Sequence, residues 1–337
     1  MIAASHPDEA IAQTADTREV PLNRVPHKFV YLILSHGEGV QLARLIHTLK
    51  SGSPDAAVVI HHDAKGELPE NIVTDASAGV YLVTPRIKVV WGEFSLLEAI
   101  LHSLEFISTH INFRWVSLIS EQDYPAMKLD AIERELEQTS YDAFIRSEPV
   151  TWKTYAYRYS FQYFRLPRNP YAYRVPALIR ELTIKSKRII NRHQNLLRFE
   201  GGVRGASNYI GIRYPKNPFT ASLVCHKGST WFAMSSRAIN YLQSFEVERP
   251  EVLAWYKRTW VPDESYFQTV IRNAKTLSVC DDHRRFIKWD AAHLAHPKTL
   301  TIKELPEILR SGKHFARKVD ARVDAALLDE LDRVVLG

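Results

Sequence analysis

Short apolar runs alternate with amphipathic segments through the first half of the chain. Residues 29–34 and 57–61 are runs of mainly apolar and β-branched residues, which is typical of buried strands. Between them, apolar side chains recur at i, i+3, i+4 and i+7 from Leu42, the spacing of one helix face. A strand at 79–83 is expected next, on the same pattern.

The alternation continues with a helix through Leu97, Leu101 and Leu104 and a strand at 115–119. Strands that alternate with helices predict an α/β domain whose mostly parallel sheet is covered on both faces. Ligands of such sheets bind beyond the carboxyl ends of the strands. We therefore expect the site where these strands end, at residues 35–36, 62–63 and 120–123.

The second half of the chain has a less regular pattern. Residues 201–218 are rich in Gly, Asn and Pro and predict an exposed loop. Further on we expect, in order, a strand at 231–234, helices near 238–242 and 252–258, and a helix opened by Asp263 and Glu264. Thr301 with Glu304 three residues later predicts a capping box at the start of another helix.

Composition limits the class of protein. A chain of 337 residues with 45% hydrophobic residues suffices for one large α/β domain or two smaller ones. No apolar run approaches the roughly 20 residues that span a bilayer, and residues 1–24 lack the apolar core of a signal peptide. Two cysteines, Cys225 and Cys280, are too few for a disulfide framework. We therefore expect a cytoplasmic protein.

Positive charge is concentrated in residues 151–200. This segment holds eleven lysines and arginines against two glutamates, an excess larger than the net charge of +6 of the whole chain. Aromatic residues interleave with the basic ones, as on surfaces that meet anionic lipid. The first interpretation is a solvated helical insertion whose aromatics pack on the main domain. Peripheral contact with an anionic inner membrane is the second, and nucleic acid is not expected.

Several motifs in this order resemble the branch family of glycosyltransferases, which comprises core-2/I-branching β-1,6-N-acetylglucosaminyltransferases and peptide O-xylosyltransferases. The matching segments are Ile60–Lys65, Trp91–Ala99, Leu118–Pro125, Thr230–Ser235, Val261–Phe267, His296–Thr301 and Phe315–Lys318. The resemblance implies a single nucleotide-sugar-binding domain of GT-A type over 28–320, with an insertion at 151–222. A polar extension, 1–27, precedes this domain and a C-terminal helix, 321–337, follows it.

The resemblance assigns the chemistry of an inverting sugar transfer to Glu264. In that reaction an acceptor hydroxyl attacks the anomeric carbon while a nucleoside diphosphate leaves, so one carboxylate takes the acceptor proton. Glu264 matches the family's general base in the Pro-Asp-Glu motif. Taken without its flanking motifs, an acidic residue at a helix start is equally typical of a residue that complements the helix dipole.

Two cationic motifs correspond to those with which the family binds the departing diphosphate without a metal. They place Lys298 and Lys318 on the phosphates, with Arg317 as a helper. A strict Asp-x-Asp metal motif is absent. Residues 121–123 and 281–282 still hold carboxylates at a spacing suited to metal binding, so the residues alone do not exclude a metal site. The resemblance implies neither metal nor other cofactor.

Further site residues follow from the same matches. His36, Asp63 and Lys65 would line the nucleotide, and Trp91 and Gly92 would border the donor site. A separate motif match supplies a residue expected to contact the acceptor.

Trp289 matches a tryptophan with which the family contacts its acceptor. The family's next aromatic is Ala291 here, which indicates a different acceptor. Trp289 is equally interpretable as a core residue.

The resemblance therefore predicts transfer of a sugar from a UDP donor to a hydroxyl of a glycan, lipid-linked saccharide or protein. N-acetylglucosamine is the first choice of sugar and xylose the second. The rival hypothesis is a non-catalytic protein that binds glycans, or a basic protein held at a membrane by residues 151–200.

Overall fold

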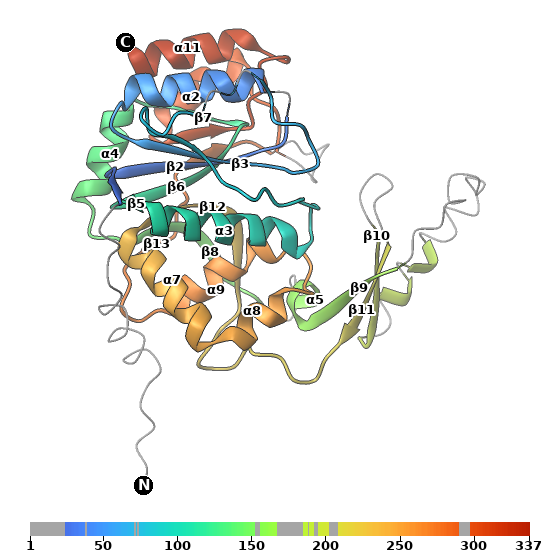
Figure 1. Cartoon of the computed structure of the whole chain (residues 1–337). Coiled ribbons are helices and arrows are strands. Elements are labelled where there is room, and N and C mark those ends of the chain that lie inside the picture. Colours follow the sequence, from blue (N-terminus) through green and yellow to red (C-terminus); the bar gives the residue numbers. More distant parts are fainter. Residues whose placement is uncertain are drawn as a thin grey trace.

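The computed structural model describes residues 24–37, 39–70, 72, 74–151, 156–166, 185–187, 189–191, 195–201, 208–289 and 297–337. Its centre is a seven-stranded sheet (Figure 1). The strands, from edge to edge, are β13 (Val279–Cys280), β8 (Ala143–Pro149), β12 (His226–Ser235), β6 (Trp115–Ser120), β2 (Phe29–Ser35), β3 (Ala57–His62) and β4 (Val80–Leu82). All neighbours are parallel except that β12 is antiparallel to β8 and β6. The predicted α/β class with a mostly parallel sheet is confirmed.

Helices cover both faces of this sheet (Figure 1). One face carries α2 (Val40–Gly52), α4 (Leu129–Gln138) and α11 (Ala325–Leu336). The opposite face carries α3 (Phe94–His110), α7 (Ser236–Glu248) and α9 (Tyr266–Asn273), with α8 (Pro250–Tyr256) beside α7. The helix expected from Leu42 is α2, the helix through Leu97 is α3, and those expected near 238–242 and 252–258 are α7 and α8.

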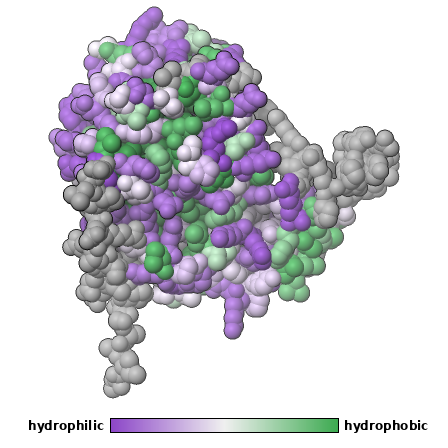
Figure 2. All heavy atoms as spheres, in the orientation of Figure 1, coloured by the Kyte–Doolittle hydropathy of each residue, from purple (hydrophilic) through white to green (hydrophobic). Residues whose placement is uncertain are grey.

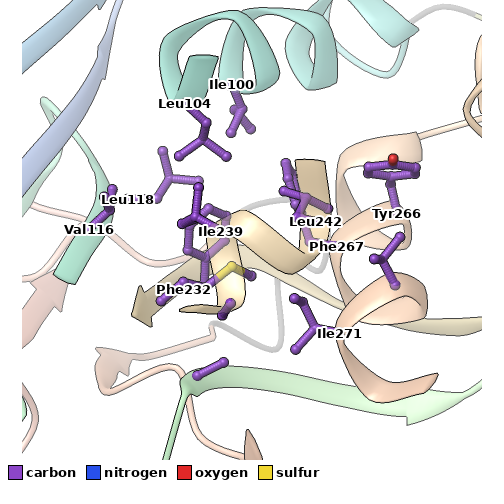
Figure 3. Packing of buried hydrophobic residues seen from close by; sticks show 14 of the residues in the cluster. Ile100, Leu104, Val116, Leu118, Phe232, Ile239, Leu242, Tyr266, Phe267 and Ile271 are labelled. Carbon is purple, nitrogen blue, oxygen red and sulfur yellow. The ribbon is translucent and has the colours of Figure 1, made fainter. Parts of the chain in front are cut away.

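Alternation along each strand divides the core into two layers. On β2, Val30 and Leu32 belong to the α3 side, whereas Tyr31 and Ile33 belong to the α2 side. Figure 3 shows the first layer, where Leu118 of β6 and Phe232 of β12 meet apolar side chains of α3, α7 and α9. Because strands of a two-sided sheet are apolar on both faces, their sequences are nearly continuous apolar runs.

A second, three-stranded sheet joins distant parts of the chain. It has the order β14 (Arg285–Ile287), β15 (Phe315–Arg317) and β7 (Asp123–Pro125), and Arg317 pairs with Asp123 across it. The short turn η4 (Ile302–Glu304) follows Thr301 and leads into α10 (Leu305–Arg310). The capping box of Thr301 and Glu304 is present, as the sequence predicts.

The described part of the insertion is mainly strand. After the short helix α5 (Ala156–Ser160), strands β9 (Phe161–Arg165), β11 (Asn208–Arg213) and β10 (Leu197–Gly201) form an antiparallel sheet that projects from the main body (Figure 1). The prediction of a loop over 201–218 is therefore wrong at β11. Gly211, one of the residues that favoured a loop, lies opposite Tyr163, and a Cβ there would lie 2.7 Å from the Tyr163 ring. This glycine permits close cross-strand packing.

Among the described residues, no helix is long and apolar enough to cross a bilayer. The face in Figure 2 mixes hydrophilic and hydrophobic residues. Short β1 (Val25–Pro26) pairs with β5 (Ile111–Asn112) where the described chain begins. Most of the expected N-terminal extension and much of the basic segment, including 167–184, lie outside the described residues.

Candidate functional site

A cavity of about 380 Å³ opens where the central strands end. Its walls include Ser35, the last residue of β2, and Asp63 and Glu121, which directly follow β3 and β6. The cavity therefore lies at the carboxyl ends where we expect the site. Other wall residues come from elsewhere in the chain, and they are Ser229, Thr230, Trp231, Asp263, Glu264, Ile287, Trp289, Pro297 and Arg317.

Glu264 lies on this cavity at the end of a short 3-10 turn, η3 (Pro262–Glu264). The preceding Val261 has a left-handed backbone (φ 53°), and its amide donates to the carbonyl of Gly92 at 2.9 Å. The Glu264 side chain is 38% exposed and accepts a 2.7 Å hydrogen bond from Arg158 Nη1. Because Arg158 belongs to α5, the insertion holds the carboxylate in place.

The neighbouring Asp263 is buried and contrasts with Glu264. Its Oδ2 accepts a 2.7 Å hydrogen bond from the Thr230 hydroxyl, while its buried Oδ1 has no hydrogen-bond partner among the described residues. Burial, together with the charge of Glu264, raises the pKa of Asp263 to about 7. The following helix α9 begins without a side-chain cap hydrogen bond. The two adjacent carboxyls thus have different environments, since Asp263 is buried and the Glu264 side chain is 38% exposed.

The part of the cavity wall next to the end of β3 carries residues expected at the nucleotide. Asp63 Oδ1 accepts hydrogen bonds from the backbone amides of Lys65 (2.9 Å) and Val89 (3.1 Å), and the Lys65 ammonium lies 3.4 Å from Oδ2. The side chain of Asp63 is therefore fixed, whereas Lys65 is half exposed and reaches over the cavity.

His36 and Glu121 form a close pair on the same side. His36 Nδ1 lies 2.5 Å from Glu121 Oε1, and Oε2 accepts from the backbone amides of His36 and Gly37. The hydrogen bond to Glu121 raises the pKa of His36. Burial opposes ionisation of Glu121, but the bonds from His36 and the two amides outweigh it and lower its pKa. Each group thus stabilises the charged form of the other.

Arg317 supplies a cation to the cavity wall. Its guanidinium lies 4.2 Å from the ring centroid of Trp231 and donates to Asp123 Oδ2 at 2.8 Å. The buried Arg285 approaches the other oxygen of Asp123, at 3.4 Å. Asp123, the last carboxylate of the 121–123 motif, is therefore neutralised by two arginines inside the fold.

The two lysines of the C-terminal motifs lie next to the cavity, and neither is among the residues that line it. Lys298 Nζ donates to Glu304 at 2.7 Å, and this bond contributes to a Glu304 pKa of about 2, against the opposing effect of burial. Burial, followed by the charge of Arg317, lowers the pKa of Lys318. The Leu300 amide donates to the Lys318 carbonyl at 2.7 Å, so the two segments lie side by side.

The aromatic candidates are placed at the cavity mouth. Trp91 and Trp289 both line it and are 54% and 57% exposed, so Trp289 is not the core residue of the alternative interpretation. Gly92 is not among the residues that line the cavity, and a Cβ added there would lie 3.5 Å from the Trp260 ring. Ala291, the position that departs from the family pattern, lies outside the described residues.

Sequence reasoning missed several cavity or contact residues, among them Arg158, Thr230 and Trp231. Arg158 lies in the basic segment, where one arginine among eleven cations carries no distinguishing signal. Trp231 and Thr230 lie in a matched motif, at a point where the register of β12 against β8 shifts between Gly228 and Phe232. A shift of register is not visible in the residue pattern.

Comparisons with known proteins agree with these observations. The family model described as Core-2/I-Branching enzyme matches residues 29–310. The beta-glucuronosyltransferase GlcAT14A of Arabidopsis thaliana is 30% identical over 33% of this chain and 25% of its own length. The beta-1,3-galactosyl-O-glycosyl-glycoprotein beta-1,6-N-acetylglucosaminyltransferase 4 of Mus musculus is 21% identical over 88% of this chain. The chain spans 63% of the length of the mouse enzyme.

Among solved structures, a Bacillus anthracis protein is described as a glucose-1-phosphate thymidylyltransferase in complex with sucrose. It superposes with a TM-score of 0.31 at 10% identity, over 76% of this chain and 86% of its own. That superposition is too poor to indicate a shared mechanism.

Proposed function

Because the chain belongs to the Core-2/I-branching enzyme family of glycosyltransferases, we propose that it transfers a sugar from a UDP donor to a hydroxyl of a glycan or glycoconjugate, with inversion. The observation that carries this proposal is one cavity that holds an accessible carboxylate, Glu264, together with the cations Lys65 and Arg317. An inverting transfer needs a base for the acceptor and positive charge for the leaving diphosphate.

In the proposed reaction, the acceptor oxygen forms a bond to the anomeric carbon from one face. The bond between that carbon and the diphosphate oxygen breaks on the other face, and the diphosphate leaves with the electron pair. Glu264 takes the proton of the attacking hydroxyl. Arg158, which donates a 2.7 Å hydrogen bond to Glu264, holds the carboxylate in place before the acceptor arrives.

Positive side chains offset the charge of the departing diphosphate in this proposal. Arg317 and Lys65 line the cavity, and Lys318 follows Arg317 directly. Lys298 would reach the phosphates only after it leaves Glu304, because the two are joined by a 2.7 Å bond. Asp123 is already neutralised by two arginines, which supports a reaction that needs no divalent metal.

N-acetylglucosamine is the proposed sugar, supported by the mouse relative that aligns with most of this chain. Glucuronate is a second candidate because the plant glucuronosyltransferase has the higher identity, over a shorter stretch. Xylose, the second choice from the motifs shared with peptide xylosyltransferases, becomes the third. A thermal-shift series with UDP-N-acetylglucosamine, UDP-glucuronate, UDP-xylose and UDP-glucose separates them, since a ligand of the folded state raises its melting temperature.

The enzymatic proposal is tested by the release of UDP from these donors, with and without chelator, in native protein and in Glu264→Gln. We expect native turnover that survives chelator and a loss of about 10²- to 10⁴-fold in the variant, the usual contribution of a general base. Glu137→Gln on α4 is the matched control. Absence of both UDP binding and turnover in the native protein refutes the enzyme assignment, and loss of turnover with chelator refutes the metal-free account.

We also propose a cytoplasmic enzyme that contacts the inner membrane through the basic segment 151–200, whose eleven lysines and arginines favour anionic lipid. Co-sedimentation with vesicles of phosphatidylcholine, with and without phosphatidylglycerol, tests this contact. Binding that requires phosphatidylglycerol and weakens with salt supports it. Equal recovery with both vesicle types refutes it.

A further inference from the structure

The projecting sheet of β9, β11 and β10 has two faces with different surroundings. Residues that pair across antiparallel strands point to the same side, so one face contains Tyr163, Tyr209 and Gly211. Trp260 packs against this face, with ring centroids 5.9 Å from Tyr163 and 4.9 Å from Tyr209. The other face therefore points away from Trp260.

That other face is apolar. Its members pair with one another across the strands and are Phe164, Leu197, Phe199, Ile210 and Ile212. Leu197 and Ile212 lie directly opposite each other and are 40% and 38% exposed, and the adjoining Leu196 is 72% exposed. Figure 2 shows hydrophobic residues gathered where Figure 1 places this sheet. A contiguous exposed apolar surface is typical of a binding surface.

The main body covers the β9 side of this apolar face. Gln162 of β9, which pairs with Ile212, donates from its side-chain amide to the Trp255 carbonyl at 3.1 Å. The guanidinium of Arg258 lies 5.2 Å from the ring centroid of Phe164. The exposed part of the face is therefore formed by β10 and β11.

The sheet and its flanks carry an excess of positive charge. Their described residues, in 156–166, 185–187, 189–191, 195–201 and 208–216, include seven lysines and arginines and one glutamate. The seven cations are Arg158, Arg165, Lys185, Lys187, Arg198, Arg213 and Lys216. Exposed apolar side chains among cations are typical of surfaces that enter the interface of an anionic membrane.

A second copy of this chain suits the face less well than a bilayer does. β10 lies at the edge of its sheet, where another molecule could add a strand. The Asn191 side chain occupies that edge, because it donates to the Phe199 carbonyl and accepts from the Phe199 amide, each at 2.8 Å. A second copy would also bring the same excess of cations against this one, whereas an anionic bilayer offers the opposite charge.

We propose that Leu196, Leu197 and Ile212 insert at the boundary between the headgroups and the acyl chains of an anionic bilayer. The inference rests on the proposed membrane contact and deepens it, because burial of apolar side chains adds to the attraction between charges. Arg158 of α5, directly ahead of β9, bonds to Glu264. The inserted sheet would therefore hold the cavity of transfer near the membrane surface.

The test is co-sedimentation of the full chain with vesicles of phosphatidylcholine, with and without phosphatidylglycerol. It is run at about 0.1 M and about 1 M salt, between which the Debye length falls from about 10 Å to about 3 Å. The variant is Leu197→Ser/Ile212→Ser. Its matched control is Val247→Ser/Val323→Ser, which changes two aliphatic residues that are 72% and 59% exposed elsewhere on the chain.

We expect native binding that requires phosphatidylglycerol and persists in part at the higher salt. The serine variant should bind about tenfold more weakly at the lower salt and lose the persistent part, while the control matches the native protein. If the serine variant is unstable, Leu197→Trp gives a second measurement. Its fluorescence should be quenched by vesicles with brominated acyl chains more strongly than that of Val247→Trp.

The insertion is overturned if the serine variant binds as tightly as the native protein, or if Leu197→Trp is quenched no more than Val247→Trp. In that case native binding that still requires phosphatidylglycerol leaves the electrostatic contact standing. A native dimer without vesicles that the serine variant abolishes would assign the face to a second copy and also overturn the inference. UDP release without vesicles, measured on the same proteins, tests the transferase proposal separately.

Discussion

Asp263 should make the protein less stable as the pH rises. The carboxyl is fully buried beside Glu264, and its pKa in the folded chain is about 7 against an ordinary 3.8. Between these values the folded state keeps a proton that the unfolded state has lost. Stability therefore falls as the pH rises through this window. At 1.36 kcal/mol for each unit of pKa, the full loss is on the order of 4 kcal/mol.

The assay is urea unfolding of native protein and Asp263→Asn from about pH 5 to about pH 8. This range crosses roughly two pH units of the window, which corresponds to a loss of about 3 kcal/mol in the free energy of unfolding. Asn keeps the acceptor for Thr230 but cannot ionise. Its fixed packing effects do not depend on pH, so the difference between the two proteins isolates Asp263. We expect the native free energy of unfolding to fall by that amount relative to the variant.

Two controls sharpen the comparison. Asp130→Asn, at an exposed site on α4, should run parallel to the native curve. Glu264→Gln removes the second cause of the raised pKa and should make the decline of native stability smaller. If the free energies of unfolding of the native protein and Asp263→Asn change in parallel with pH across the whole range, this account of the buried carboxyl is refuted.

Three further outcomes are expected. Gly228→Ala should lower the free energy of unfolding by at least about 1–3 kcal/mol, measured in urea, because a Cβ would lie 1.8 Å from the Arg146 carbonyl oxygen; an unchanged midpoint contradicts this. Arg158→Ala should reduce sugar transfer about 10- to 100-fold at an unchanged UDP Kd, since it removes the charge-assisted bond to Glu264; a change in UDP affinity alone contradicts that role. Arg317→Ala should weaken UDP binding about tenfold by calorimetry, with Arg317→Lys intermediate, and equal affinity in all three proteins contradicts a phosphate contact.

The sequence was sufficient for the core architecture. Apolar runs such as 29–34 and 57–61 are typical of strands that are buried on both faces. The helical spacing of apolar residues from Leu42 indicates a helix with one face packed on an apolar surface. These are local patterns with one common solution. The position of the cavity follows from the same topology, because the carboxyl ends of parallel strands meet at one edge.

The arrangement of charges within the cavity could not be predicted from the sequence. Asp123 and Glu121 stand two residues apart and have similar chemistry, yet one is sealed between two arginines and the other faces the cavity. Lys298 is bound to Glu304, and Arg317 rather than Lys318 is on the wall. The ion-pair partner of each side chain and its position in the cavity depend on residues from distant segments of the chain.

The sequence by itself determined the fold class, the family motifs and the edge of the sheet at which they gather, because backbone periodicity and apolar burial act over short stretches of chain. Tertiary structure alone decided that Arg158 holds Glu264, that Gly211 belongs to a strand, and that Arg317 packs against Trp231. Each of these contacts joins residues far apart in the chain, and its energy depends on three-dimensional proximity that no local pattern encodes.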